Sequence, residues 1–440
     1  MRYNLIYRCA GWQAIMFLRE SELVKKINKR LKVLIWGTVS FLFFGMLYGW
    51  SIFVAPLEAE FGWSRVETSV AYTISLVCYT LGLFFNGLLS KKMGIRFPGF
   101  MGTAMMVVGL AGSAFINSLG ALYIFYGVFW GSGIGLCYNS WLAVVVAWYP
   151  EKKGFASGVL LMGVGVGGLI IGTMIGAIIN TSIGWRGSLM ILAALLLVEA
   201  FFALRYMHMP DTAAEESIVS QTEQSVSYSP LQMLRQPCFW SYAVWRMALC
   251  GLCQAIIGQQ IMLITESGAA AFLATMTVGI VSIGNGGSRV LLGMFTDGFG
   301  YIKTLLFISV GTGIASVALL LGYTKGIPYA TFAALILIGA CYGGTIMISS
   351  LFVRNVFGPE HFQSNLGAAS LVNIGGTMTS PLIISMMYST YHSYKQFIIL
   401  TVIVSVVSLI LVAATYLFEK RIKSGSKAVN PQNFLKEGSQ

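Results

Sequence analysis

Twelve long apolar stretches, joined by mostly short polar connections, constrain this chain more than any other feature of its sequence. About 20 apolar residues cross the hydrocarbon core of a bilayer, where every backbone polar group must be bonded within the protein. The expected spans are 33–57, 68–90, 97–117, 121–148, 154–180, 187–207, 238–264, 272–296, 303–323, 328–356, 366–390 and 395–418. The sequence therefore predicts an all-α integral membrane protein with twelve transmembrane helices, located in the cell membrane.

Charge composition agrees with this prediction. Charged residues make up 10% of the chain, whereas soluble proteins carry roughly 25%. The net charge is +12, but the basic residues gather in the terminal segments and short loops, as in membrane proteins. We therefore expect the lipid bilayer as a partner, no nucleic acid, and a monomer.

The distribution of Lys and Arg predicts the orientation. With both termini in the cytoplasm, 22 of the 28 Lys/Arg fall on the cytoplasmic side. Arg65, Arg186, Lys325 and Lys395 fall on the other side, and two more lie within spans. Basic residues are retained in cytoplasmic loops, so both termini are expected inside.

A polar segment after the sixth span divides the chain into two halves. It is acidic and rich in Ser and Gln, which is typical of a flexible linker. The expected parts are a basic N-terminal segment (1–32), a six-helix bundle (33–207), a cytoplasmic linker (208–237), a second six-helix bundle (238–418) and a cytoplasmic tail (419–440).

The two halves repeat short motifs at a nearly constant offset. The loop after span two has the pattern G-x-x-x-K-x-x-G, and the loop after span eight has G-x-x-x-D-x-x-G, 206 residues later. Residues 150–158 begin with a Pro-Glu pair and end with a glycine, and residues 359–367 repeat this pattern at an offset of 209. Two such pairs predict a duplicated, pseudo-symmetric unit, as in many secondary transporters. The four loop glycines are Gly87, Gly94, Gly293 and Gly300.

These loops resemble the signature of the major facilitator superfamily. In that family the acidic residue of the loop helps to hold the cytoplasmic side closed through charge and helix-dipole contacts. The second copy keeps the acid as Asp297, whereas the first has Lys91 in its place. The resemblance therefore implies gating roles for both loops, with a different closing contact in the first half.

A narrower resemblance, to the oxalate/formate antiporter family and its monocarboxylate-carrier relatives, extends from Leu31 to Phe418. The motifs that carry it are Tyr48-Gly-Trp-Ser51, Phe61-Gly-Trp-Ser64, Trp148-Tyr-Pro150, Gly184-Trp-Arg186 and Asn285-Gly-Gly-Ser-Arg289. Each motif alone is weak, and the set as a whole is specific.

Arg289 is the candidate for binding a substrate carboxylate. It lies roughly 12 Å from the end of span eight, and a charge near the bilayer centre costs at least ~2.5 kcal/mol unless it faces water or a partner. Ser282, Asn285 and Arg289 share one helical face, and a guanidinium binds carboxylate through two parallel hydrogen bonds. The family's substrate-binding arginine matches this position. The alternative is a structural arginine paired with carbonyls or an acid.

The family's oxalate exchangers carry a second cation, a lysine, in span eleven. Alignment with the family pattern puts Asn373 at that position. One central cation neutralises one carboxylate, so a monocarboxylate is favoured over oxalate.

The other charged residues within spans have two interpretations each. Arg246 in span seven is expected to snorkel to the cytoplasmic face or to pair, with contact to the substrate pathway as the alternative. Glu199 in span six is expected to pair with a neighbouring Arg or Lys, with a buried carboxylate of a proton relay as the alternative. Without a central acid, the sequence favours exchange, or symport in which proton and substrate move together.

Aromatic and amide side chains complete the candidate site. Tyr48, Tyr138 and Tyr342 lie in spans where the family has pocket aromatics, and tyrosine offers an apolar face with one polar group. Gln259 in span seven is expected to bond the substrate or to bridge helices.

The sequence therefore predicts a secondary active transporter of small organic anions that works by alternating access, as an antiporter or a proton-linked symporter. The alternatives are a carrier of a neutral or cationic solute, or a transporter-like membrane sensor. The three histidines lie at span ends or in loops, and no convergent catalytic set is evident. We expect no enzymatic activity, no metal and no cofactor.

Overall fold

The computed structural model describes residues 28–47, 49–210 and 227–428, and these ranges are helical apart from short connections. The first helix covers Asn28–Leu47 and ends in the short helix η1 (Gly45–Leu47). The N-terminal half continues with α2 (Ser51–Phe61), α3 (Arg65–Met93), α4 (Arg96–Ala114), α5 (Leu119–Leu122), η2 (Tyr123–Trp130), α6 (Gly131–Trp148), α7 (Lys153–Ile179) and α8 (Gly184–Tyr206). The C-terminal half contains α10 (Pro230–Leu234), α11 (Pro237–Gly258), α12 (Gln260–Glu266), α13 (Ala271–Phe299), α14 (Tyr301–Lys325), α15 (Pro328–Phe357), α16 (Phe362–Tyr391) and α17 (Lys395–Ala428).

Ten helices of the described chain are long and apolar enough to cross a membrane, and α11 with α12 makes an eleventh if that pair, bent by 61°, is one span. The α16 helix has 30 residues but is not among these candidates. Its sequence carries Ser364, Asn365, Ser370 and Asn373, and it packs on α11 of its own half and on α3 of the other half. The count of twelve spans and the orientation of the termini therefore stay predictions.

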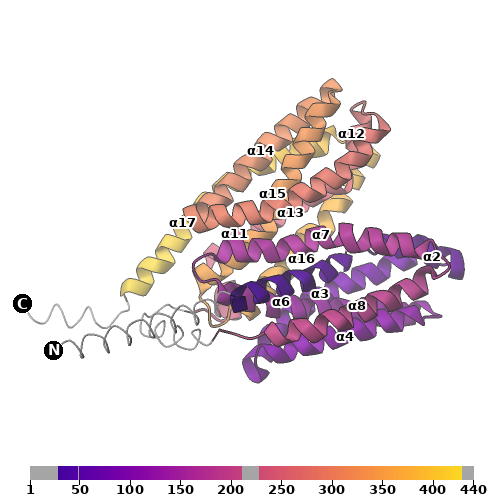
Figure 1. Ribbon diagram of the computed structural model, residues 1–440. Helices are drawn as coiled ribbons and strands as arrows, with labels where there is room; N and C mark the ends of the chain where they lie inside the picture. Colours follow the sequence, from indigo (N-terminus) through magenta and orange to yellow (C-terminus); the bar gives the residue numbers. More distant parts are fainter. Residues whose placement is uncertain (1–27, 48, 211–226, 429–440) are drawn as a thin grey trace, which may run out of the picture.

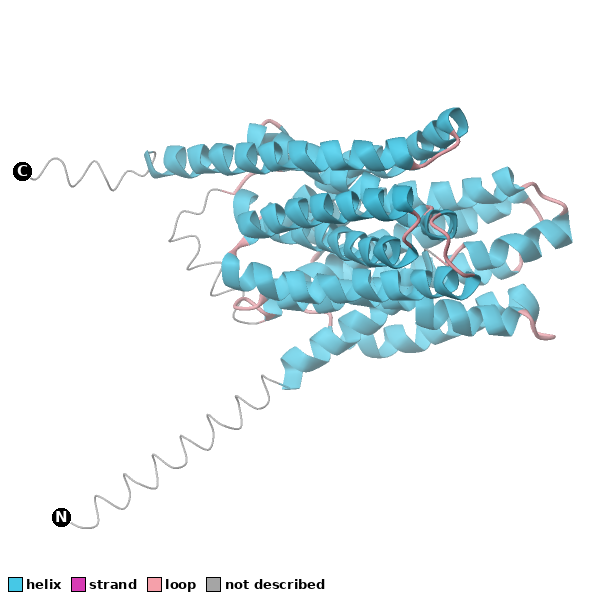
Figure 2. Ribbon diagram, turned by 90° about the horizontal axis from the view of Figure 1, so that it is seen from above, coloured by secondary structure: helices cyan, strands magenta, loops and turns pink. Residues whose placement is uncertain are grey.

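Two groups of helices lie side by side and diverge toward one end (Figure 1). Residues 28–206 form one group and residues 237–428 the other, as the colours of Figure 1 show. Seen from above, the long helices run roughly along one direction (Figure 2). The halves meet mainly where α7 packs on α13 and where α3 packs on α16. Outward-facing apolar side chains on α8 and α17, among them Phe201 and Ile410, suit a lipid environment.

The described contacts between the halves are tightest at one end, which we call the closed end. Backbone approaches there are so close that a methyl group at Gly158 would collide with the backbone of Arg289, and one at Gly367 with that of Phe84. Toward the other end, a methyl group at Gly279 would meet no atom within 4 Å. The space between the halves therefore widens away from the closed end.

The repeated loops have the same backbone geometry. Gly94 ends α3 with φ 79° and ψ 162°, and Gly300 ends α13 with φ 85° and ψ 158°. Residues with a side chain rarely adopt such a positive φ. The glycines that recur in the sequence therefore make the same turn in both halves.

Two expected boundaries differ from the structure. The helix expected to end at 418 continues as α17 to Ala428. Of the expected linker, residues 211–226 lie outside the described part of the chain, while the residues that follow are attached to the second half: the Tyr228 backbone N–H donates to the Phe357 carbonyl at 2.9 Å. The described end of the linker is thus part of the second bundle.

Candidate functional site

A cavity of about 460 Å³ lies between the halves. Residues of α3, α6 and α7 line it on one side, and residues of α11, α15 and α16 line it on the other. Its size suits a small molecule. Among the described residues that line it, Arg246 is the only charged one, and there is no Asp or Glu. The cavity is therefore electropositive.

Arg246 is the guanidinium that faces this cavity. It is 8% exposed, and its Nε and Nη1 atoms are buried with no hydrogen-bond partner among the described residues. A buried cation without a partner costs several kcal/mol. The expectation that Arg246 snorkels or pairs does not hold for the described chain, since the side chain points into the space between the halves instead.

The spacing of residues along α11 explains why Arg246 faces inward. Arg246, Cys250 and Gln254 recur every four residues, which places them on one helical face, and all three line the cavity. The four-residue spacing of these side chains is visible in the sequence, but the sequence does not show which face of α11 meets the other half.

Three of the predicted site residues line the cavity: Tyr138, Tyr342 and Asn373. The Tyr138 ring packs against the Phe41 ring at a tilt, with ring centroids 4.7 Å apart, so its ring is held in place. The Asn373 Oδ1 atom is buried with no partner in the described chain. Tyr48 lies outside the described residues.

Arg289 lies in an adjoining smaller pocket of about 40 Å³, which shares Tyr79, Tyr138 and Ile346 with the main cavity. The side chain is 3% exposed. Its Nη1 donates to the Leu161 carbonyl of α7 at 2.6 Å, and its Nη2 donates to Asn285 Oδ1 at 3.3 Å. Arg289 and Asn285 therefore lie together as expected, and in this conformation Arg289 links the two halves through a carbonyl.

Gln259 lies apart from the cavity. It occupies the break between α11 and α12, and its Oε1 accepts a hydrogen bond from the Tyr394 hydroxyl at 3.2 Å. It is not among the described residues that line the cavity. Of the two roles expected for Gln259, substrate bonding and helix bridging, its position in the described chain fits helix bridging.

Asp297 joins the halves at the closed end. Its Oδ1 accepts from the Gly154 backbone N–H at 2.7 Å and its Oδ2 from the Phe155 N–H at 2.8 Å. These N–H groups belong to the first turn of α7, which needs external acceptors and carries a partial positive charge. Gly293, one turn earlier, lies so close to Gly154 that neither position has room for a side chain.

The equivalent contact in the first repeat has a different chemistry. A methyl group at Gly87 would collide with Ser364 at the start of α16. Lys91 is exposed, and a lysine has no acceptor atom that could bond the N–H groups of a helix start. One contact between the halves is therefore charged, and the other depends on close packing.

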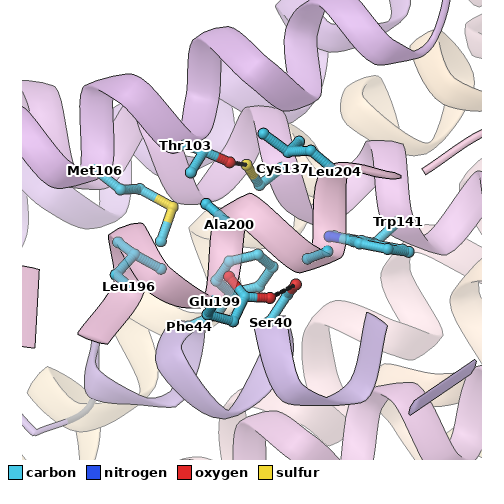
Figure 3. A pocket seen from close by; sticks show the side chains of 11 residues that line it. Ser40, Phe44, Thr103, Met106, Cys137, Trp141, Leu196, Glu199, Ala200 and Leu204 are labelled. Atoms are coloured by element: carbon cyan, nitrogen blue, oxygen red, sulfur yellow. Dashed lines mark hydrogen bonds between the residues drawn. The ribbon is translucent and has the colours of Figure 1, made fainter. Parts of the chain in front are cut away.

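Glu199 lies away from the main cavity, inside the first half. It is 6% exposed and borders a space of about 10 Å³, room for one water at most. Its Oε1 accepts from the Ser40 hydroxyl at 2.5 Å, and Thr103 and Cys137 form a second pair nearby (Figure 3). No ion pair of the described chain involves Glu199, so the expected pairing with Arg or Lys is absent there.

Comparison with known proteins agrees with the fold. The model of the Major Facilitator Superfamily matches residues 34–323 and 262–436. The chain belongs to this superfamily of membrane transporters, which are not enzymes, and it is a multi-pass protein of the cell membrane.

Individual relatives narrow the resemblance. The chain is 27% identical to the oxalate:formate antiporter of Oxalobacter formigenes over 330 residues, 73% of this chain and 76% of that protein. It is 30% identical to monocarboxylate transporter 12 of Rattus norvegicus over 151 residues, 33% of this chain and 30% of that protein. The resemblance inferred from the sequence motifs is therefore confirmed.

Solved structures support the fold alone. The proton:xylose symporter XylE has a TM-score of 0.65 at 16% identity, covering 90% of this chain and 96% of that one. The E. coli fucose:proton symporter FucP has a TM-score of 0.63 at 13% identity, covering 88% and 98%.

Proposed function

We propose that this protein is a secondary active carrier of small organic anions, with carboxylates as the substrate class. The observation that carries the proposal is the electropositive cavity between the halves, lined by Arg246 and by no acid of the described chain. A desolvated guanidinium favours a carboxylate ligand strongly. The similarity to a protein named as an oxalate:formate antiporter supports the same class.

A monocarboxylate is the favoured cargo. Asn373 lines the cavity where a second cation would stand in the family's oxalate exchangers, and Arg289 is already bonded to Leu161 and Asn285. One guanidinium then remains for a single carboxylate. Exchange, or symport in which proton and substrate move together, is the favoured mode, because the cavity has no acidic lining residue in the described chain to carry a proton.

The difference between the tightly packed closed end and the wider opposite end supports alternating access. In this conformation the closed end is held by Asp297 and by the close packing at Gly293 and Gly87. If the closed end is cytoplasmic, as the basic loops favour, the cavity faces outward. A carboxylate that reached Arg289 would compete with the Leu161 carbonyl, and this competition would weaken the α7–α13 contact.

Counterflow in proteoliposomes tests the proposal. Vesicles loaded with unlabelled formate, acetate, lactate or oxalate should accumulate the same labelled anion from outside, more strongly for the monocarboxylates. Arg289→Gln should lower the rate at least tenfold, because a charged hydrogen bond contributes about 1.5–3 kcal/mol. Uptake of a neutral or cationic solute with no carboxylate flux would overturn the proposal, and binding without flux would favour a sensor.

A further inference from the structure

A cluster of polar groups without partners faces the cavity from the second half. Besides Nε and Nη1 of Arg246, the atoms concerned are Ser349 Oγ, Asn373 Oδ1 and Gln254 Oε1, each buried with no hydrogen-bond partner in the part of the chain that the structure describes. All four residues line the cavity, and they come from α11, α15 and α16. Buried polar groups in native proteins are nearly always bonded, so a concentration of exceptions at one place needs an explanation.

We propose that these four residues form a subsite for a carboxylate whose carbon chain carries a hydrogen-bond donor such as a hydroxyl group. The subsite rests on the proposed function and names its cargo more narrowly. Arg246 and Ser349 supply donors to the carboxylate. Asn373 and Gln254 supply amide oxygens that accept from the hydroxyl.

The donor and acceptor chemistry supports this division. A guanidinium has five N–H donors and no acceptor, and a carboxylate has acceptors only. A plain carboxylate would satisfy Arg246 but would leave the Asn373 and Gln254 oxygens without a donor. A hydroxyl on the neighbouring carbon supplies that donor, and a site that bonds a hydroxyl discriminates strongly against the analogue that lacks it.

A purely structural role for Arg246 predicts different neighbours. Structural arginines in membrane interiors pair with acids or backbone carbonyls, as Arg289 does with Leu161 at 2.6 Å. Arg246 has no such bond in the described chain. The hydroxyl of Ser349, a 2% exposed residue that lines the same cavity, does not bond it either. Arg246 therefore receives the cargo in this conformation, while Arg289 holds the halves together.

The test compares pairs of anions that differ by one hydroxyl group, acetate with glycolate and propionate with lactate. Wild-type protein in proteoliposomes should show an apparent KM about 10-fold lower for glycolate than for acetate. Arg246→Gln should raise the KM of both anions by about 10- to 100-fold, and Arg246→Lys should recover part of the loss. Asn373→Leu should abolish the preference for glycolate and leave acetate nearly unchanged.

Matched controls separate the subsite from general damage. Arg205→Gln removes an exposed arginine that does not line the cavity and whose guanidinium lies 4.4 Å from the Phe201 ring centroid. Ser316→Ala removes a buried serine whose hydroxyl donates to the Thr312 carbonyl of its own helix at 2.7 Å. Both should transport like wild type. Monodisperse elution in detergent and an unchanged Tm report folding of each variant.

The outcomes distinguish the two levels of the proposal. If the wild type exchanges carboxylates and Arg289→Gln impairs this exchange, but Arg246→Gln and Asn373→Leu keep wild-type KM values, the subsite is wrong and the proposed function stands. If the wild type exchanges no carboxylate, both are wrong. If Arg246→Gln fails to fold, the glycolate-to-acetate ratio of Asn373→Leu decides, and an unchanged ratio overturns the subsite.

Discussion

Replacing Asp297 by Asn should open the closed end. Asp297 accepts two backbone N–H bonds, at 2.7 and 2.8 Å, from the first turn of α7. Asparagine keeps one acceptor oxygen and no charge, so one charge-assisted bond and the attraction to the helix dipole are lost. A hydrogen bond to a charged group contributes about 1.5–3 kcal/mol, and the exposure of Asp297 puts the loss near the lower value. About 1.4 kcal/mol corresponds to a tenfold change in the ratio of closed to open states.

Thiol labelling can measure this ratio. Ser157, buried beside this contact on α7, is replaced by cysteine, and a membrane-impermeant maleimide is added from the compartment that the closed end faces. Labelling of the same chain without the Ser157→Cys change is subtracted. The labelling rate should rise about tenfold with Asp297→Asn, as the closed-to-open ratio falls.

Lys91 provides the matched control for this experiment. It occupies the equivalent position in the first repeat but is exposed and has no acceptor atom, so Lys91→Asn should leave labelling unchanged. Equal labelling of Asp297→Asn and wild type would refute the account of this contact.

Three further predictions follow from other contacts. Lys91→Asp should lower the same labelling rate about twofold to fivefold, because an acid near the start of α16 gains about 0.3–1 kcal/mol from the helix dipole; no change would mean that this loop does not face the helix start. Glu199→Gln should keep carboxylate counterflow within about twofold of wild type, because Glu199 borders a separate cavity and an amide keeps a polar partner for Ser40; loss of counterflow would place Glu199 in the transport path. The hydrogen bonds from Arg186 and then Trp185 lower the pKa of Glu60 below its ordinary value of 4.5, so this contact stabilises the fold above that pH and is lost as pH falls through the lowered pKa. The Tm of wild type should therefore fall more than that of Glu60→Gln below pH 4.5, and parallel curves would contradict the linkage.

The sequence predicted the positions of the spans better than it predicted which side of each helix faces lipid, the other half or the cavity. Continuous apolar runs locate lipid-facing helices well, since almost any polar group there is excluded. The α16 helix was expected from its length, but it is too polar to count among the candidate spans of the described chain, because it contacts the other half and the cavity. Composition alone does not separate such a helix from a lipid-facing one.

The candidate site was predicted in part, and the differences have physical causes. Asn373, Tyr138 and Tyr342 do line the cavity, since motifs shared with a family carry positional information. The sequence left two roles open for Gln259, because the break between α11 and α12, which begins after Gly258 and turns the Gln259 side chain toward Tyr394, could not be located from the sequence. For Arg246, snorkelling or pairing was favoured over contact with the substrate pathway, because the sequence does not show how α11 is rotated against the other half.

The two contacts that hold the closed end should respond to different environments. The contact at Asp297 joins a charged carboxylate to the positive end of a helix dipole and is partly exposed, so dissolved salt, with a screening length of about 8 Å at physiological ionic strength, weakens it. The contact between Gly87 and Ser364 depends on the absence of a single carbon atom, so salt leaves it unaffected while added side-chain volume separates the helices. The salt concentration of the compartment that the closed end faces would then set how readily the Asp297 contact opens, whereas the Gly87–Ser364 contact would open equally readily at any salt concentration.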